Sequence, residues 1–302
     1  HIKAVNDLAK DRILAIEVRR LGVRDKELRR VGVGPAVGHR HNAPRVVLEL
    51  VLEPLFVGEE LGLLGVVGHA EHVGEVVEHA AGEFPRESCG LLVVRKGKEI
   101  YVPCKNIGVG TDQFVIDPQD YVKADKRGEI VGVVHSHPNL PATPSQADCV
   151  ACEASGVPWF IVSYPNGQWF ELAPRGYVAP LVGREWSHGV LDCYSIVRDW
   201  YAQERGLSLP DFQRFDEWWR RGENLYVDNF ADAGFVVVEP DDLLVGDVFL
   251  MQVNSEVPNH AAINLGDGLI LHHLQGRLSS RDVYGGYWQK ITTHILRHQS
   301  QR

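Results

Sequence analysis

Two histidines separated by a single residue, His135 and His137, carry the clearest chemical signal in the sequence. They follow directly on Ile130–Val134, an apolar run of strand length. In a strand, residues i and i+2 point to the same side, so both imidazoles can bind one metal ion. Asp148 lies at the start of an expected helix beyond a proline-rich loop, where it can supply a third ligand. Two imidazoles and one carboxylate leave the fourth position of a tetrahedral Zn²⁺ free for water, which is the arrangement of a catalytic site.

A metal-bound water molecule needs a base, and Glu87 is the upstream candidate for that role. Ser145 precedes Asp148 by three residues, and this spacing is also that of a capping box, in which the side chains serve helix amides. A His-x-His pair by itself is more often part of a surface or a core than of a metal site. A single glutamate near a helix end is equally ordinary. The chemical interpretation therefore depends on the four parts occurring together.

A second group of residues centres on Cys193, which begins an expected helix directly after Asp192. At a helix N-terminus, the dipole and the free amides favour the thiolate, which is the nucleophilic form of cysteine. His260 begins an expected strand and can act as the base. A lone cysteine after an aspartate is more often a buried thiol, so this interpretation also depends on the partner residues.

The third residue of the second group comes from the next strand, after the turn Gly266–Gly268. Directly opposed residues of an antiparallel pair share a face. A three-residue loop centred on Gly266 sets His260 opposite His272, whereas a two-residue loop presents His273 instead. We expect His272 to orient the base, with His273 as the alternative.

The elements that must position these residues occur in two blocks, separated by a segment with proline and glycine. We expect an α+β fold of two domains, residues 71–175 and residues 180–302. In the first domain the expected helices are Glu71–Ala81, Gln119–Lys126 and Gln146–Ala154, and the expected strands are Leu91–Val94, Ile100–Val102, Ile130–Val134, Trp159–Tyr164 and Gln168–Leu172. In the second domain the expected helices are Cys193–Glu204 and Asn224–Ala233, and the expected strands are Phe235–Val238, Asp247–Val253, His260–Leu265 and Leu269–Leu274.

The composition excludes several classes of protein. The chain has 302 residues, of which 44% are hydrophobic and 24% are charged, enough apolar material for packed cores. No stretch approaches the ~20 consecutive apolar residues of a membrane span. The net charge of −9 gives no reason to expect nucleic-acid binding. Five cysteines are an odd and low number, which argues against a disulfide scaffold.

The N-terminal region differs from the rest of the chain. Residues 1–87 contain no Ser, Thr, Tyr, Trp, Cys or Gln. We expect no secretory signal peptide, because no basic segment precedes an apolar run with a small-residue cleavage site. Residues 1–70 are either an accessory domain of biased composition or the product of a misplaced start or a shifted reading frame, and we predict little order there.

The first group of residues resembles the motif of the JAMM/MPN metallopeptidases, through Glu87, then His135-Ser-His-Pro, and then Ser145-x-x-Asp. The resemblance implies a JAMM/MPN-like α/β domain in which His135, His137 and Asp148 bind Zn²⁺. It also implies that Glu87 is the general base and that Ser145 helps to stabilise the oxyanion.

The second group resembles the NlpC-type cysteine peptidases, a papain-like group, through Asp192-Cys-Tyr, Asn259-His-Ala-Ala-Ile and a histidine twelve positions after His260. In that comparison Cys193 attacks an amide carbonyl, His260 moves the proton, and His272 fixes the tautomer of His260. The family often has a tyrosine upstream of the nucleophile helix, and the sequence alone identifies no residue with it.

The order of the two domains resembles the phage tail tip assembly protein K family, over roughly residues 75–298. The resemblance implies a virion-associated tail protein made in the cytoplasm of the host bacterium, with tail tip proteins and peptidoglycan peptides as partners. It implies that the metal centre hydrolyses a peptide or isopeptide bond. It implies that the cysteine centre cleaves peptidoglycan peptides on the γ-D-glutamyl–diamino acid side. Two alternatives remain open: a structural tail-tip component in which one or both centres are inactive, and a cellular isopeptidase or amidase.

Overall fold

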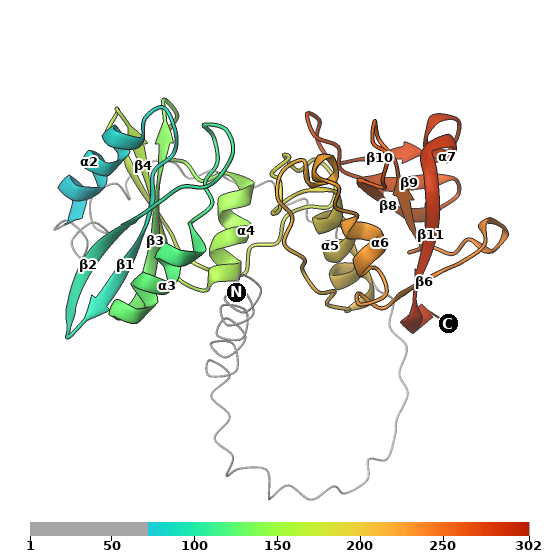
Figure 1. Ribbon diagram of the computed structural model, residues 1–302, viewed down its shortest axis with the longest axis horizontal. Helices are drawn as coiled ribbons and strands as arrows, with labels where there is room; N and C mark the ends of the chain where they lie inside the picture. The colour runs from blue at the N-terminus through green and yellow to red at the C-terminus, as the bar shows by residue number, and fades with distance from the viewer. Residues whose placement is uncertain (1–71, 302) are drawn as a thin grey trace, which may run out of the picture. The chain divides into compact units, whose positions relative to one another are not determined.

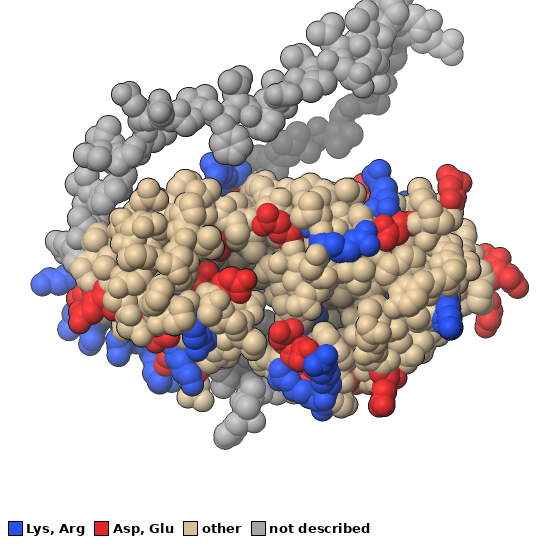
Figure 2. All heavy atoms as spheres, turned by 90° about the horizontal axis from the view of Figure 1, so that it is seen from above, with Lys and Arg blue, Asp and Glu red and all other residues tan. Residues whose placement is uncertain are grey.

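The computed structural model describes residues 72–301, in which helices pack on two separate sheets (Figure 1). This arrangement confirms the predicted α+β fold with two domains. The predictions for residues 1–70 lie outside the described residues. Within residues 72–301, every helix is too short or too polar to cross a membrane. Basic and acidic side chains lie next to one another on the face shown in Figure 2.

The first sheet has five strands in the order β2-β1-β3-β4-β5. These strands are Cys89–Arg95 (β1), Lys98–Cys104 (β2), Glu129–Pro138 (β3), Trp159–Tyr164 (β4) and Trp169–Leu172 (β5). β3 and β4 run parallel, while the other neighbouring strands are antiparallel. A parallel pair needs a crossover connection, and a helix supplies it here. The connection that leaves the end of β3 therefore carries Ser145 and Asp148.

Helices cover both faces of this sheet. They are Val73–Glu83 (α2), Pro118–Arg127 (α3) and the crossover helix Gln146–Ser155 (α4). Successive residues of β1 point to opposite faces. Leu91 packs with Ala124 of α3 and Cys152 of α4, whereas Leu92 packs with Val76 of α2. The apolar run of β1 is therefore buried on both sides, which fixes β1 and its neighbour β3 at the centre of the domain.

The second sheet has six antiparallel strands in the order β10-β9-β8-β7-β11-β6. The strands are Phe235–Val237 (β6), Val248–Met251 (β7), His260–Gly266 (β8), Leu269–His272 (β9), Ser280–Val283 (β10) and Thr292–His298 (β11). The α-helices are Cys193–Arg205 (α5), Leu225–Asn229 (α6) and Tyr287–Ile291 (α7), and the 3₁₀ helices are Trp218–Arg221 (η3), Pro240–Asp242 (η4) and Gln299–Gln301 (η5).

The long helix α5 lies on one face of the second sheet. Its buried residues include Ile196 and Trp200, which pack against Leu250 and Ile263 of the sheet. The opposite face packs against α7, where Trp288 closes a smaller cluster. The N-terminus of α5, which carries Cys193, is thereby held against the strands that carry the histidines.

Several details differ from the sequence prediction. The helix expected over Asn224–Ala233 ends at Asn229, and the following residues continue as turns closed by a bond from the amide of Phe235 to the carbonyl of Phe230. The strand Ser280–Val283 and the segment Tyr287–His298 were not foreseen. β10 is an edge strand with little buried surface, so it lacks the apolar alternation that marks a half-buried strand.

A buried arginine ties the segment before α5 to the second domain. The Arg184 side chain is fully buried, and it donates to the carbonyls of Ala179 and Pro180 and to the carboxylate of Asp199 on α5. Its backbone amide donates to the hydroxyl of Ser279, in the loop between β9 and β10. The chain leading to Cys193 is therefore anchored on two sides.

Candidate active centres

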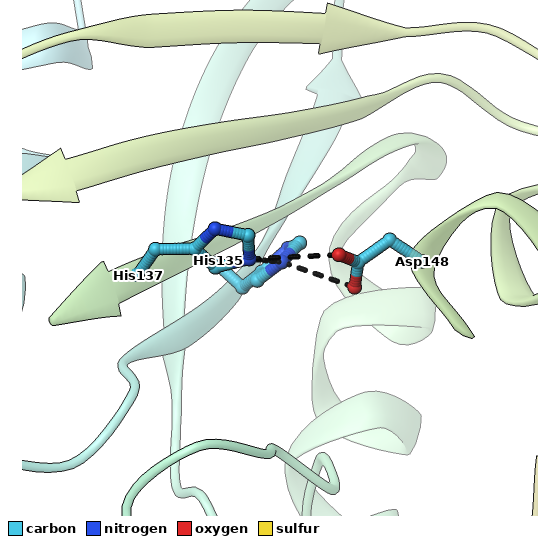
Figure 3. Close-up of side chains that lie close together, drawn as sticks. All are labelled: His135, His137 and Asp148. Atoms are coloured by element: carbon cyan, nitrogen blue, oxygen red, sulfur yellow. Dashed lines mark hydrogen bonds and ion pairs between the residues drawn. The ribbon is translucent and has the colours of Figure 1, made fainter. Parts of the chain in front are cut away.

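The strand β3 places His135 and His137 on the same side, and both side chains are buried. Their Nε2 atoms lie 3.1 Å apart. Asp148, in the first turn of α4, lies with Oδ1 3.3 Å from Nε2 of His135 and Oδ2 3.5 Å from Nε2 of His137 (Figure 3). The structure thus brings together the three residues that the sequence pattern selected as ligands.

The spacing of these atoms fits a metal coordination sphere. With bonds of about 2.0–2.1 Å to nitrogen or oxygen, the corners of a tetrahedron around Zn²⁺ lie about 3.3 Å apart. Nδ1 of His137 lies 2.8 Å from the carbonyl oxygen of Pro141, to which it donates, so in the neutral ring Nε2 carries the lone pair. That lone pair faces the carboxylate of Asp148, and two acceptors at this distance repel each other unless a proton or a metal ion lies between them. His135, His137 and Asp148 could therefore hold a divalent metal ion.

Ser145 and Asp148 form the capping box of α4. The Ser145 hydroxyl accepts from the amide of Asp148 at 3.1 Å and donates to Oδ2 of the same residue at 2.8 Å. The amide of Ser145 donates to Oδ2 at 2.7 Å. The capping role of Ser145 is therefore present in the structure, and the oxyanion role implied by the resemblance stays a prediction.

Glu87 lies just before β1 and is 6% exposed. Burial raises the pKa of Glu87 to about 8, His137 opposes this shift, and Asp148 adds to it. The chain at this point is fixed by two bonds between Ser88 and Ser136 of β3, at 2.8 and 3.1 Å. Glu87 is therefore held beside the cluster by the pairing of β1 with β3.

An aromatic residue missed by the sequence analysis covers the cluster. The ring of Phe114 stacks on His135 with centroids 4.7 Å apart, and Trp159 contacts the same imidazole edge-on at 5.5 Å. Phe114 belongs to the loop between β2 and α3. The side chain of Asn106 stabilises this loop through four hydrogen bonds to backbone groups. No spacing rule links Phe114 to β3, so the sequence carried no signal for this contact.

Cys193 is the first residue of α5, and Asp192 is the residue that caps this helix. Oδ1 of Asp192 accepts from the amides of Tyr194 and Ser195 at 3.0 and 2.9 Å. The guanidinium of Arg214 lies 2.8 Å from Oδ2 of Asp192, and both side chains are buried. The first amides of the helix are therefore occupied by Asp192.

The Cys193 thiol differs from the expectation of a thiolate favoured by the helix. Burial, together with the neighbouring Asp192 carboxylate, raises the pKa of Cys193 to about 11. Sγ lies 3.0 Å from the hydroxyl of Tyr226 and 3.9 Å from the carbonyl of Asn259, and the backbone of Ala261 also bonds to it. His260 is not among these partners, although it lines the same cavity. In this state the sulfur is a thiol bonded to Tyr226.

His260 and His272 form a hydrogen bond across neighbouring strands. Nε2 of His260 on β8 lies 3.0 Å from Nδ1 of His272 on β9. Nε2 of His272 lies 3.0 Å from Oδ2 of Asp282 on β10. The alternative residue, His273, faces the other way, with both ring nitrogens buried and unpaired among the described residues. The structure therefore brings His272 to His260.

The register that produces this contact differs from the predicted one. The hairpin loop has two residues, Asp267 and Gly268, which by itself would present His273. A bulge between Asn264 and Gly266 shifts the register by one residue, so that Ala262 and not His260 is opposite His272. His260 is the diagonal neighbour on the same face, within reach of a long side chain.

Tyr226 and Asp282 are the residues that sequence reasoning missed in this centre. Tyr226 was noted only as part of an aromatic segment between the cysteine and the base. Asp282 lies in the edge strand that was not foreseen. A search for an acidic residue in the strand after His272 would have found Asp282, because a histidine that orients another commonly bonds to a carboxylate.

Comparisons with known proteins agree with both halves of the chain. A family model described as prokaryotic homologues of the JAB domain matches residues 69–173, and the NlpC/P60 family matches residues 183–297. The tail tip assembly protein K of Escherichia phage N15 is 38% identical over 235 residues, which are 76% of this chain and 95% of that protein. The protein of the same name from Escherichia phage lambda is 42% identical over 187 residues, which are 62% of this chain and 91% of that protein.

Solved structures give weaker likenesses. A JAB1/MPN domain protein from Archaeoglobus fulgidus is 23% identical, with 36% of this chain and 87% of that one covered and a TM-score of 0.25. An NlpC/P60 family protein from Bacillus cereus is 11% identical, with 73% of this chain and 66% of that one covered and a TM-score of 0.28. With TM-scores this low, neither likeness bears on the chemistry of the two centres.

Proposed function

Because this chain belongs to the tail tip assembly protein K family, with a JAB-type domain followed by an NlpC/P60-type domain, we propose that it is a phage tail-tip peptidase with two separate hydrolytic centres. The observation that supports this proposal most is the grouping of His135, His137 and Asp148 with ligand atoms within 4.8 Å of one another. The resemblance to a cysteine peptidase contributes the second centre, Cys193 with His260.

At the metal centre, His135, His137 and Asp148 would hold Zn²⁺, which supplies an activated water and polarises the carbonyl to be attacked. The Glu87 carboxylate takes the proton from the attacking water and passes it to the leaving nitrogen. A raised pKa suits a group that must both accept and donate a proton near neutral pH. The Ser145 hydroxyl donates its single proton to Asp148 in this structure, so to stabilise the oxyanion it would turn that proton toward the substrate.

At the cysteine centre, His260 takes the proton from Sγ of Cys193 while the sulfur forms a bond to the carbonyl carbon of the substrate. The hydroxyl of Tyr226 and the amide of Cys193 stabilise the oxyanion. His260 then gives its proton to the leaving amine, and the carbon–nitrogen bond breaks. Water hydrolyses the resulting thioester and restores the thiol. His272 holds His260 in place through their hydrogen bond.

The substrates follow from the family rather than from the geometry. The cysteine centre cleaves peptidoglycan peptides on the γ-D-glutamyl–diamino acid side. The metal centre cleaves a peptide or isopeptide bond, in a tail protein during assembly. The protein acts with other tail tip proteins, in association with the virion, after synthesis in the host cytoplasm.

The test uses the full chain and two single variants, Cys193→Ala and His135→Ala. Purified peptidoglycan fragments and a peptide library with amide and isopeptide bonds are incubated with each protein, and the products are identified by mass spectrometry. We expect Cys193→Ala to lose only the peptidoglycan products and His135→Ala to lose only the products of the metal centre. Identical products from all three proteins would contradict the proposal.

A second candidate function is favoured by one observation, the bond from the Cys193 thiol to Tyr226 rather than to His260. A thiol held in this way fits a structural tail-tip component whose cysteine centre binds peptides without cleaving them. In that case the full chain binds peptidoglycan fragments, and Cys193→Ala changes neither binding nor the fragments. Membership of a phage family argues against the third possibility, a cellular isopeptidase or amidase.

A further inference from the structure

Three neighbouring strands of the second sheet each contribute one side chain to a continuous row of hydrogen bonds. His260 on β8, His272 on β9 and Asp282 on β10 are linked by two contacts of 3.0 Å. Ser280 lies opposite His272, and Asp282 is its diagonal neighbour on the same face. The row is therefore built by the register of β9 and β10, and it ends on a carboxylate.

The carboxylate of Asp282 is held in the ionised form by further donors. Arg277 donates to Oδ2 at 3.2 Å and to Oδ1 at 3.0 Å, and the hydroxyl of Ser280 donates to Oδ1 at 3.1 Å. Burial opposes ionisation of Asp282, but the hydrogen bonds from Arg277 and His272 outweigh it and lower the pKa of this carboxyl. An ionised carboxylate can only accept hydrogen bonds.

This restriction passes along the row from one ring to the next. Because Asp282 can only accept, Nε2 of His272 must carry a proton. The neutral ring of His272 then has a lone pair on Nδ1, so Nε2 of His260 must carry the proton that bridges them. The neutral ring of His260 is left with its lone pair on Nδ1, the form that a base needs. Within residues 72–301, this Nδ1 has no hydrogen-bond partner.

The two imidazole rings are shielded from water, whereas the carboxylate of Asp282 is partly exposed. Trp288 of α7 packs edge-on against His272 with centroids 4.7 Å apart, and it also contacts His260 at 6.1 Å. His272 is 1% exposed and His260 is 3% exposed. The tautomers of both rings therefore depend on the protein group at the end of the row.

We propose that Asp282 is a positioning residue of the cysteine centre, which fixes through His272 the tautomer in which His260 can accept the proton of Cys193. The inference rests on the proposed function for its consequence in catalysis. The tautomers themselves exist whether or not the centre cleaves a substrate, so the two can fail separately.

The first measurement needs no variant. In the full chain with ¹⁵N-labelled histidine, the ring nitrogens of His260 and His272 are assigned by NMR, with His260→Gln and His272→Gln samples to identify the signals. We expect the proton on Nε2 in both rings at neutral pH. A proton on Nδ1 of either ring would overturn the inference.

The second measurement compares Asp282→Asn with the parent chain. The amide can donate as well as accept, so it no longer imposes the proton on Nε2 of His272, and we expect a mixture of tautomers. The expected loss in kcat on peptidoglycan fragments is about 10- to 100-fold, the range seen when the partner that orients a metal-bound histidine is removed, with KM unchanged. Asp282→Glu, which keeps the carboxylate, should recover most of the activity.

The pH profile separates positioning from a purely structural role. The charged groups beside the two histidines are Asp282 and Arg277; the titratable groups nearby are the Cys193 thiol in the same cavity and His273, which lies on the other side of the strand. Of these, only Asp282 stabilises the protonated form, so its removal should lower the apparent pKa of the histidine pair and move the acid limb of kcat/KM to lower pH. Alkylation of Cys193 by iodoacetamide, followed by peptide mapping, should show the same displacement without any substrate.

The matched control is Asp267→Asn, which removes the same charge from the exposed turn of the β8–β9 hairpin, where φ is +50° and asparagine is tolerated. It should leave the tautomers, kcat and the acid limb unchanged. A fall in kcat for Asp282→Asn with unaltered tautomers and an unaltered acid limb would mean that Asp282 only supports the fold, and the inference would be wrong. If the parent chain cleaves nothing, the NMR and alkylation results still decide the inference, and the proposed function alone fails.

Discussion

The two centres solve the problem of holding catalytic groups in different ways. In the first domain His135, His137 and Asp148 bring potential ligand atoms to within 3.5 Å of one another, a spacing that could hold a divalent metal ion. In the second domain the row from His260 to Asp282 alternates donors and acceptors, so the protein completes it alone. In the proposed function, the first centre depends on a metal ion, and the second depends on which ring nitrogens carry protons.

Metal removal tests this difference with the largest expected effect. Prolonged chelation should abolish all cleavage by the metal centre and leave the cysteine centre unchanged, because the proposed cleavage at the second centre uses the thiol of Cys193 and the imidazole of His260. The parent chain should contain zinc at close to one ion per chain, as measured by elemental analysis. If the ion is present at about 100 times its Kd, its loss should lower the free energy of unfolding of the first domain by about 2.7 kcal/mol.

The control for metal removal is His137→Ala, which should bind little zinc and respond little to the chelator. Restoring zinc should recover the chelated parent but not this variant. Zinc-free parent protein with full activity would contradict the assignment of His135, His137 and Asp148 as ligands.

Replacing Tyr226 by phenylalanine tests whether the hydroxyl of Tyr226 stabilises the oxyanion at the cysteine centre. The change removes the hydroxyl 3.0 Å from Sγ and keeps the ring. We expect kcat of the cysteine centre to fall about 10²-fold, the usual cost of one lost oxyanion donor. Cleavage by the metal centre should not change.

Tyr194→Phe is the matched control, since its hydroxyl bonds to the carbonyl of Pro210 and not to the thiol. It should affect stability more than kcat. If Tyr226→Phe instead increases the rate, the bond between Tyr226 and the thiol restrains the nucleophile, and the role of Tyr226 as an oxyanion donor is wrong.

The same contrast explains how much of each centre the sequence could predict. The metal cluster draws on residues two apart in one strand and three apart at one helix start, so strand periodicity and the capping-box pattern place His135, His137, Ser145 and Asp148. Both rules are local, so they apply even when the rest of the fold is not known. Phe114 lay beyond them because its contact with His135 depends on the path of a loop.

The cysteine centre depends on long-range pairing. Tyr226 contacts Cys193 although the two residues are 33 positions apart in the sequence, and no local pattern predicts this contact. His272 was selected by a register that the structure does not have, yet it lies on the expected face because the bulge after Asn264 compensates for the shorter loop. A one-residue change in register reverses the face of a strand, so sequence alone could not decide between His272 and His273.

Asn106 provides a test of intermediate size, directed at the loop that covers the metal cluster. Its buried side chain bonds to four backbone groups, on Glu87, Gln113, Gly108 and Val115. Asn106→Ala leaves these groups without that partner, and we expect the first domain to lose about 2 kcal/mol of stability. Cleavage by the metal centre should also fall, because the hydrogen bonds of Asn106 hold the backbone at Glu87 and next to Phe114.

Hydrogen exchange followed by mass spectrometry measures this effect separately in each domain. Peptides from β1 and β3 should exchange faster in Asn106→Ala, and peptides from β8 and β9 should not. Asn166→Ala, in an exposed turn of the same domain, is the control and should change neither. Faster exchange in both domains would show that the two centres are not independent in stability.

The smallest expected effect concerns two buried imidazoles, one in each domain. His135 has Asp148 beside it, whereas neither ring nitrogen of His273 has a hydrogen-bond partner within residues 72–301, and burial lowers the pKa of His273 to about 4. In the unfolded chain, His273 binds a proton below about pH 6.5. In the folded chain, it binds that proton only below about pH 4. The contribution of His273 to the free energy of unfolding is therefore fully present above about pH 6.5, and it is lost as the pH falls toward 4. Between pH 7 and pH 5 the loss should be about 1 to 2 kcal/mol.

The variant His273→Phe keeps a ring against Trp186 and should remove this part of the pH dependence, as measured by thermal unfolding at the two pH values. The control is His294→Asn, at the partly exposed start of β11, which should retain the pH dependence of the parent. An equal pH dependence in His273→Phe and the parent would mean that His273 is paired in solution, and the contrast between the two buried rings would disappear.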